Sequence, residues 1–364
     1  MNKDIIIHLA GYCQPLGKDN LMKLNTLFHE TLKDRKLVIQ TNPNTIRKSH
    51  QVAAFYEYID DYAMLEFLLK NNISPNVFNI LDMTPFHYAL INNNKKIVAL
   101  LCHYGANINE PLPLLHPIHL AVYNHDVNLV TLLIKDLKCL NVQTKLGETP
   151  LLIAIKQRCT DIMMLLVNAG AGVNIADHNG ITPSHLLTKR GDINGLRLLM
   201  NHGADINKQT IQGYNCIDYA ILHKKIEIVK VLLNKGGDIG IKSTNQYTSL
   251  MVAACVDDVL ILKLILDKNP SLINHENRYG WTALCWSVYH NKMNNVKYLL
   301  SCGATTHLNI KLVDRNVKVG QTLLDIARDK NYINIISLLE AAKNPKTAKT
   351  QNSISDTKHR CVIQ

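Results

Sequence analysis

Two short apolar runs and the polar turns between them recur along most of the chain at a nearly constant spacing. A Thr-Pro pair, or another polar residue in its place, precedes the first run, and a Gly-containing turn often follows the second. The residues that open the copies are Thr84, His116, Thr149, Thr182, Asn215, Thr248, Thr282 and Thr322. The intervals between them are 32 to 34 residues, except the last, which is 40. A period of this length indicates a repeat architecture.

Each repeat is expected to contain two helices. Thr84 can cap the free amides of a first helix, and Pro85 at its first position loses no hydrogen bond. A second helix over 97–101 then ends at a turn in which glycine supplies a left-handed residue. Neither helix can bury its apolar face alone, so stacked repeats are expected to share one core. Residues 50–79 look like a degenerate first copy, and the long last interval predicts an insertion near 309–318.

The repeat resembles the ankyrin repeat over about residues 50–342. The resemblance rests on four openings, TPFHYA, HPIHLA, TPLLIA and TPSHLL, at 84–89, 116–121, 149–154 and 182–187. It implies an all-α solenoid of about eight to nine helix-turn-helix repeats over 46–342 that binds other proteins. Ankyrin repeats use a histidine at the fourth motif position to hold neighbouring turns. The resemblance implies this structural role, in place of metal binding, for His87, His119 and His185.

Composition narrows the class of protein. The 364 residues include 40 Lys and Arg against 29 Asp and Glu, a net charge of +11, and 47% are hydrophobic. These values favour a folded chain with some attraction to acidic partners or anionic membranes. Nine cysteines without a Cys-x-x-Cys pair are typical of free thiols in a reducing compartment. We recognise no signal peptide, membrane-spanning run, nucleic-acid module or catalytic motif. We therefore expect no enzyme, no cofactor or metal, and no nucleic-acid partner.

Residues 1–45 break the repeat period and are expected to form a small helical subdomain. Leucines at helical spacing follow an aspartate that can cap the second helix. The segment resembles an F-box, which docks on the Skp-type adaptor of a cullin ubiquitin ligase, although the usual Leu-Pro opening is missing. The resemblance implies adaptor contacts by Ile6, Leu9, Leu16, Leu21, Leu24 and Phe28. The alternative is a plain cap that covers the core of the first repeat.

The chain ends in a polar, basic tail over 343–364, which we expect to be disordered and which closes with Cys-Val-Ile-Gln. A cysteine, two aliphatic residues and a permitted last residue form a C-a-a-X prenylation signal, and Gln364 favours a farnesyl group on Cys361. One lipid chain binds membranes only marginally, so the basic residues of the tail would add attraction to anionic lipid. An accidental terminus without modification is the alternative.

Ankyrin arrays use their turn tips and concave inner helices for recognition, so the resemblance implies a protein-binding groove. The tips of the later repeats carry Tyr214, Tyr247 and Trp281, and aromatic side chains dominate binding hot spots. Trp286 falls on a core position and is expected to pack internally. The candidate binding residues are Ile181, Lys189, Arg190, Tyr214, His223, Tyr247, Trp281 and Tyr289. Their basic members predict an acidic ligand around an apolar anchor.

The three segments predict an adaptor. The repeats would hold a protein target, the F-box-like start would recruit a ubiquitin ligase of the SCF type, and farnesylation would place both on the cytosolic face of a membrane. The combination is similar to Legionella-type secreted effectors, which use the prenylation and ubiquitin machinery of a host cell. The alternative is a scaffold or inhibitor that acts by occupying its partner, without a ligase.

Overall fold

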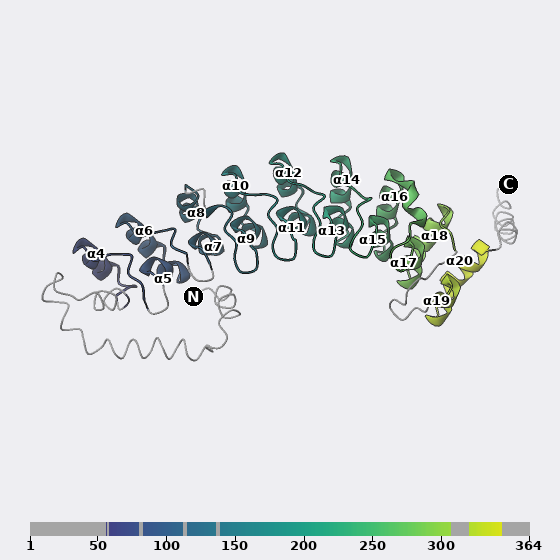
Figure 1. Ribbon diagram of the computed structural model, residues 1–364, viewed down its shortest axis with the longest axis horizontal. Helices are drawn as coiled ribbons and strands as arrows, with labels where there is room; N and C mark the ends of the chain where they lie inside the picture. Colours follow the sequence, from purple (N-terminus) through teal and green to yellow (C-terminus); the bar gives the residue numbers. More distant parts are fainter. Residues whose placement is uncertain are drawn as a thin grey trace, which may run out of the picture. The chain divides into compact units, whose positions relative to one another are not determined.

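The computed structural model describes Tyr56 and residues 58–79, 83–111, 115–135, 139–306 and 320–343. All regular secondary structure in these residues is helical, which confirms the prediction of an all-α fold of paired helices. The chain divides between His178 and Asn179 into two compact units, called unit 1 and unit 2. Within each unit the helices form two rows (Figure 1).

The described part of unit 1 contains three complete helix pairs and the second helix of the degenerate copy predicted over 50–79. The first helices are α5 (Pro85–Ile91), α7 (Pro117–Tyr123) and α9 (Pro150–Lys156). The second helices are α4 (Tyr62–Lys70), α6 (Lys95–His103), α8 (Val127–Leu133) and α10 (Thr160–Asn168). Each first helix packs on its own second helix, and α7 packs between α5 and α9.

Unit 2 repeats the same arrangement. Its first helices are α11 (Pro183–Arg190), α13 (Cys216–Leu222), α15 (Ser249–Cys255), α17 (Ala283–Tyr289) and α19 (Leu323–Asp329). Its second helices are α12 (Ile193–Asn201), α14 (Ile226–Asn234), α16 (Val259–Lys268), α18 (Met293–Ser301) and α20 (Ile333–Lys343), and a 3-10 helix η3 (Pro270–Asn274) follows α16. The first helices contact one another in chain order, so their apolar faces share one core with the second helices.

The N-termini of the first helices are capped as the sequence predicts. At α5 the hydroxyl oxygen of Thr84 accepts the backbone amide of His87, and the amide of Thr84 donates to Nδ1 of the His87 ring at 3.1 Å. Because Nδ1 is the acceptor, Nε2 carries the proton and donates to the carbonyl oxygen of Glu110 at 2.7 Å. The ring therefore joins its own helix cap to the turn that follows α6.

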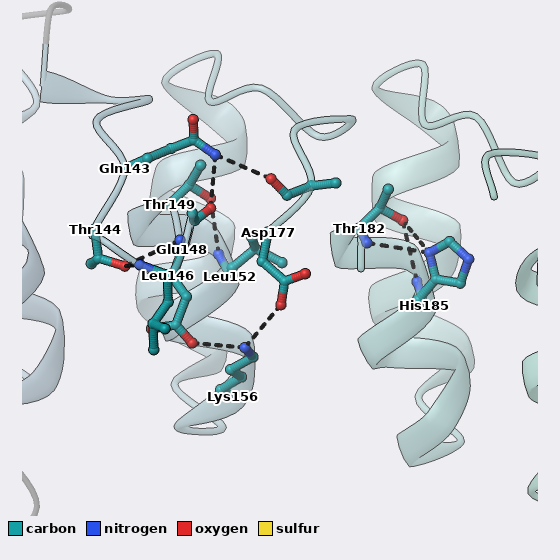
Figure 2. Close-up of polar contacts among 12 residues, drawn as sticks. Gln143, Thr144, Leu146, Glu148, Thr149, Leu152, Lys156, Asp177, Thr182 and His185 are labelled. Carbon is teal, nitrogen blue, oxygen red and sulfur yellow. Dashed lines mark hydrogen bonds and ion pairs between the residues drawn. The ribbon is translucent and has the colours of Figure 1, made fainter. Parts of the chain in front are cut away.

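The same pair of bonds recurs in both units. His119 reaches the carbonyl of Val142 at 3.0 Å, and His185 reaches the carbonyl of Tyr214 at 3.2 Å. Figure 2 shows the cap formed by Thr182 and His185 in unit 2. The structural role predicted for the three histidines is confirmed.

Several predicted features lie outside the described residues. They are the subdomain over 1–45 with Ile6, Leu9, Leu16, Leu21, Leu24 and Phe28, the insertion near 309–318, and the terminal Cys361. Among the helices that the structure does describe, none has both the length and the apolar character required to cross a membrane.

Candidate protein-binding surface

The surface of unit 2 that best fits a binding role runs along the ends of its first helices. It contains the residues seven and eight positions after each N-cap residue, which we call the first-helix stripe. The members are Lys189 and Arg190, Leu222 and His223, Cys255 and Val256, Tyr289 and His290, and Asp329 and Lys330. Because α11, α13, α15, α17 and α19 pack in this order, the pairs follow one another along one row of helices (Figure 1). All members except the buried Val256 are exposed or half-buried.

The α11–α13 end of the stripe is basic. Lys189, Arg190 and His223 are exposed there, as predicted, and the structure adds Lys224 and Lys225 on the turn after α13. Burial lowers the pKa of His223, and the nearby positive charges of Lys189 and Lys225 lower this pKa further. The charges of two adjacent repeats are thus close enough to repel one another.

An aromatic side chain lies within this basic end. The ring of Tyr219 packs edge-on against His185 with 4.9 Å between ring centroids, and the centroid of the His223 ring lies 6.2 Å from that of Tyr219. Leu222, one turn along α13 from Tyr219, is 43% exposed. The basic end therefore has an apolar centre, and neither Tyr219 nor Leu222 was among the predicted binding residues.

The other end of the stripe is aromatic, and it corrects one prediction. Trp281 is fully buried, with 0% of its surface exposed, because its indole packs against Trp286 at 4.6 Å and Tyr289 at 5.3 Å. Its ring cannot contact a partner directly, so its assignment as a binding residue was wrong. Trp286 is buried, which confirms its predicted packing role. Tyr289 stays half-buried, and the ammonium of Lys330 lies 4.0 Å from its ring centroid.

The residues that the turn tips expose are not the ones that were predicted. Ile181, Tyr214 and Tyr247, each just before a helix cap, are all half-buried. In the tip before α13 the amide of Thr210 donates to the carbonyl of Tyr214, and Ile211 at the apex is 61% exposed. The signal that sequence reasoning missed is the glycine at 213, because a Gly at the end of such a turn places its exposed apex two residues earlier.

Unit 1 has a cation at a stripe-equivalent position, but this cation is neutralised within the chain. Lys156 at the end of α9 lies 2.7 Å from a carboxylate oxygen of Glu148 and 3.4 Å from one of Asp177 (Figure 2). Both carboxylates are buried, whereas Lys156 is partly exposed. Pairing with Lys156 offsets the loss of hydration that burial imposes on them.

Models of known protein families match most of the repeats. A family model described as ankyrin repeats in three copies matches residues 118–210, 217–311 and 250–349, and a second, described as ankyrin repeats in many copies, matches 60–101. This chain belongs to the ankyrin-repeat family. The solved ankyrin-repeat domain of Bcl-3, described as a unique member of the IkappaB protein family, is similar to it at 25% identity. That match covers 61% of this chain and 97% of the Bcl-3 chain with a TM-score of 0.50.

The side chains of the ankyrin repeats indicate a role in protein recognition. Burial raises the pKa of the Cys216 thiol to about 12 and that of Cys285 to about 11, so neither forms the thiolate of a nucleophile at neutral pH. Within the residues that the structure describes, no cluster of three His, Cys, Asp or Glu side chains could hold a metal ion. Ankyrin-repeat proteins are typically non-catalytic scaffolds for protein–protein interactions, and the first-helix stripe supplies cations, ring edges and aliphatic carbons for such contacts.

Proposed function

We propose that this protein is an adaptor that captures a partner protein on the first-helix stripe of unit 2. The observation that carries the proposal is the side-chain set at the stripe positions. Leu222 is exposed and precedes His223 and Lys224 in the chain. Tyr289 is half-buried with the ammonium of Lys330 over its ring. Tyrosine is enriched among the residues that dominate binding interfaces, and an exposed leucine beside cations offers apolar surface to a partner. In the test, Leu222→Glu should abolish capture of the partner while the repeats stay folded.

The proposal includes recruitment of a ubiquitin ligase of the SCF type through residues 1–45. Its support is the F-box-like pattern of leucines in the sequence, with Leu21 and Leu24 on the helix that would face the Skp-type adaptor. The experiment is a pull-down from eukaryotic lysate with the full-length chain and a chain starting at residue 46, probed for the Skp adaptor and cullin. Recovery with full-length protein alone supports recruitment. If neither sample recovers the Skp adaptor or cullin, residues 1–45 serve only as a cap of the first repeat.

The proposal also includes anchoring to the cytosolic face of a membrane, in a host cell that the protein enters by secretion. Its support is the terminal Cys361-Val362-Ile363-Gln364 sequence behind a basic tail. Cys361→Ser removes the thiol that would carry the farnesyl group. The membrane fraction of the protein in eukaryotic cells should fall sharply, and an unchanged fraction would contradict prenylation.

A non-catalytic scaffold or inhibitor that acts by occupancy is the second candidate, because the stripe alone suffices for capture. Leu21→Ala with Leu24→Ala separates the two candidates. An adaptor for a ligase would still bind its partner but would no longer cause ubiquitin-dependent loss of it. A scaffold would behave as the unmodified chain does in both assays.

A further inference from the structure

The basic end of the first-helix stripe concentrates cationic side chains from two adjacent repeats. We call Lys189, Arg190, Lys224 and Lys225 the cationic cluster, and the imidazole of His223 lies near Lys189 and Lys225. All of them are exposed except Lys225, which is half-buried. Among the described residues, no carboxylate oxygen lies within 4 Å of the ammonium group of Lys189, Lys224 or Lys225. Like charges held near one another by folded repeats repel one another, so an anion that binds between them is favoured.

The equivalent position in unit 1 shows what this cluster lacks. Lys156 lies 33 residues before Lys189, and two buried carboxylates hold its ammonium group at 2.7 and 3.4 Å. The same 33-residue step takes Glu148 and Asp177 to Ile181 and Thr210, neither of which carries a charge. Because the internal carboxylates are replaced by neutral residues, Lys189 has its charge available for a carboxylate that comes from outside.

Backbone geometry holds the cluster in place. Lys224 adopts a left-handed φ of 52°, and Gly191, which ends α11, has a φ of +85°. The Lys225 side chain lies over Gly191, since a Cβ added there would be 3.4 Å from its Cδ and Cε atoms. Lys225 of one repeat thus contacts the end of α11 in the repeat before it. The ring centroid of Tyr219 lies 6.2 Å from that of His223, which follows the exposed Leu222 in the chain.

We propose that the cationic cluster binds an acidic linear segment of the partner protein, with an apolar side chain of that segment packed on Leu222 and Tyr219. The inference rests on the proposed function, because it states the chemistry of the protein that the repeats hold. Charge complementarity selects the acidic residues. The apolar centre favours a peptide over a lipid headgroup. A peptide can place an aliphatic side chain on Leu222 and Tyr219 while its acidic side chains reach the cationic cluster.

The test selects peptides without assuming a partner. A random displayed-peptide library is bound to immobilised full-length protein, and the enriched sequences are read. Each enriched peptide is then titrated by fluorescence anisotropy against the unmodified protein and two double variants. The cluster variant carries Lys189→Glu and Lys224→Glu, on adjacent first helices or their turns. The matched control carries Lys263→Glu and Lys297→Glu, which are exposed on the adjacent second helices α16 and α18 and change the net charge equally.

The expected result is enrichment of Asp and Glu around a Leu, Ile or Phe, with affinity that falls as salt rises. The cluster variant should bind such peptides at least about tenfold more weakly, and the control should bind them normally. Circular dichroism must show both variants folded. Enrichment of peptides without acidic residues, equal binding by the cluster variant, or no enrichment at all would overturn the inference.

Two further results distinguish failure of the acidic-segment inference from failure of capture on the stripe. Neutral peptides whose binding is lost with Leu222→Glu would overturn the acidic segment while supporting capture on the stripe. Vesicles containing phosphatidylserine are the second probe. If the vesicles bind the unmodified protein but not the cluster variant, and no acidic peptide binds, then the cluster contacts a membrane and the inference is wrong.

Discussion

The side-chain amide of Asn295 on α18 donates to the backbone carbonyl of Val256 at 2.7 Å and to that of Ala254 at 3.3 Å. Most first helices are followed by a left-handed residue, such as Lys224 or Asn291, but α15 ends with Val256 in an extended conformation. The carbonyl of Val256 also accepts the amide of Asp258 at 2.9 Å, and that of Ala254 also accepts the hydroxyl of Ser287 at 3.4 Å, so the buried Asn295 supplies each carbonyl with a second donor.

Asn295→Ala is expected to destabilise the protein by about 1–3 kcal/mol, because it removes two buried hydrogen bonds that each contribute about 0.5–1.5 kcal/mol. Urea unfolding followed by circular dichroism measures the change. Asn294→Ala is the control, since Asn294 is exposed on the same helix and its loss should change stability by less than about 0.5 kcal/mol. Equal effects of the two substitutions would show that the bond to Val256 contributes little.

Acid is expected to weaken unit 1 through the buried His119, among other groups. Burial lowers the pKa of His119 from 6.5 to about 4, so the folded state favours the neutral ring. The unfolded chain binds the proton more readily, and stability therefore falls as the pH drops from about 6.5 towards 4, by up to about 3 kcal/mol.

The matching experiment compares urea unfolding at pH 7 and pH 5 for the unmodified protein and for His119→Leu. Leucine occupies this position in the next repeat, at Leu152, so the fold accepts it. The variant should be less stable at pH 7 but lose less stability on acidification. His178→Gln, at an exposed site of unit 1, serves as control. An unchanged acid loss in His119→Leu would contradict the assignment.

In unit 2 a buried carboxylate gives a pH dependence of the opposite sign. Burial raises the pKa of Asp218 from 3.8 to about 6, and hydrogen bonds from the Ser249 hydroxyl at 2.6 Å and the Asn215 amide at 3.2 Å limit the rise. A folded pKa above the unfolded value means that the folded state favours the protonated acid. The contribution of Asp218 to stability therefore increases as the pH falls from about 6 to about 4.

Ser249→Ala removes one donor from this carboxylate and should raise the pKa of Asp218 further. We expect a loss of about 1–3 kcal/mol at pH 8, where the group must be charged, and a smaller loss at pH 5. Unfolding curves at the two pH values measure both. Ser301→Ala, on an exposed serine of α18, should change neither. A loss of equal size at pH 5 and pH 8 would contradict a charged Asp218.

Fluorescence of the two tryptophans of the chain tests whether Trp281 is buried. Both indoles are buried, so their emission should be blue-shifted relative to free tryptophan and protected from iodide quenching. The neighbouring Tyr289 covers part of this cluster, and Tyr289→Ala should increase the quenching. Strong iodide quenching in the unmodified protein would mean that Trp281 is exposed after all.

The repeat could be predicted from sequence because its signals are local. Thr-Pro capping, the histidine at the fourth position and the glycine turns each act within a few residues of one another. The period placed every first helix correctly from α5 to α19. The core position of Trp286 followed from the same register.

The binding surface was harder to predict because exposure depends on neighbouring repeats. Trp281 was expected at an exposed tip, but Trp286 and Tyr289 cover it. Lys156 and Lys189 occupy equivalent positions, and only the buried partners of Lys156 show that their charges are used differently. Leu222 gave no signal in the sequence, since an exposed and a buried leucine at the end of a helix look alike.

Capture of a partner on the first-helix stripe is tested most directly by two matched leucine substitutions. Leu222 lies on first helix α13, and Leu260, which is 61% exposed, lies on second helix α16. Full-length protein, Leu222→Glu and Leu260→Glu are each used to capture proteins from eukaryotic lysate, with quantitative mass spectrometry as the readout. The account predicts a partner that the unmodified protein and Leu260→Glu retain and Leu222→Glu loses at least about tenfold. Identical capture by all three proteins would contradict it.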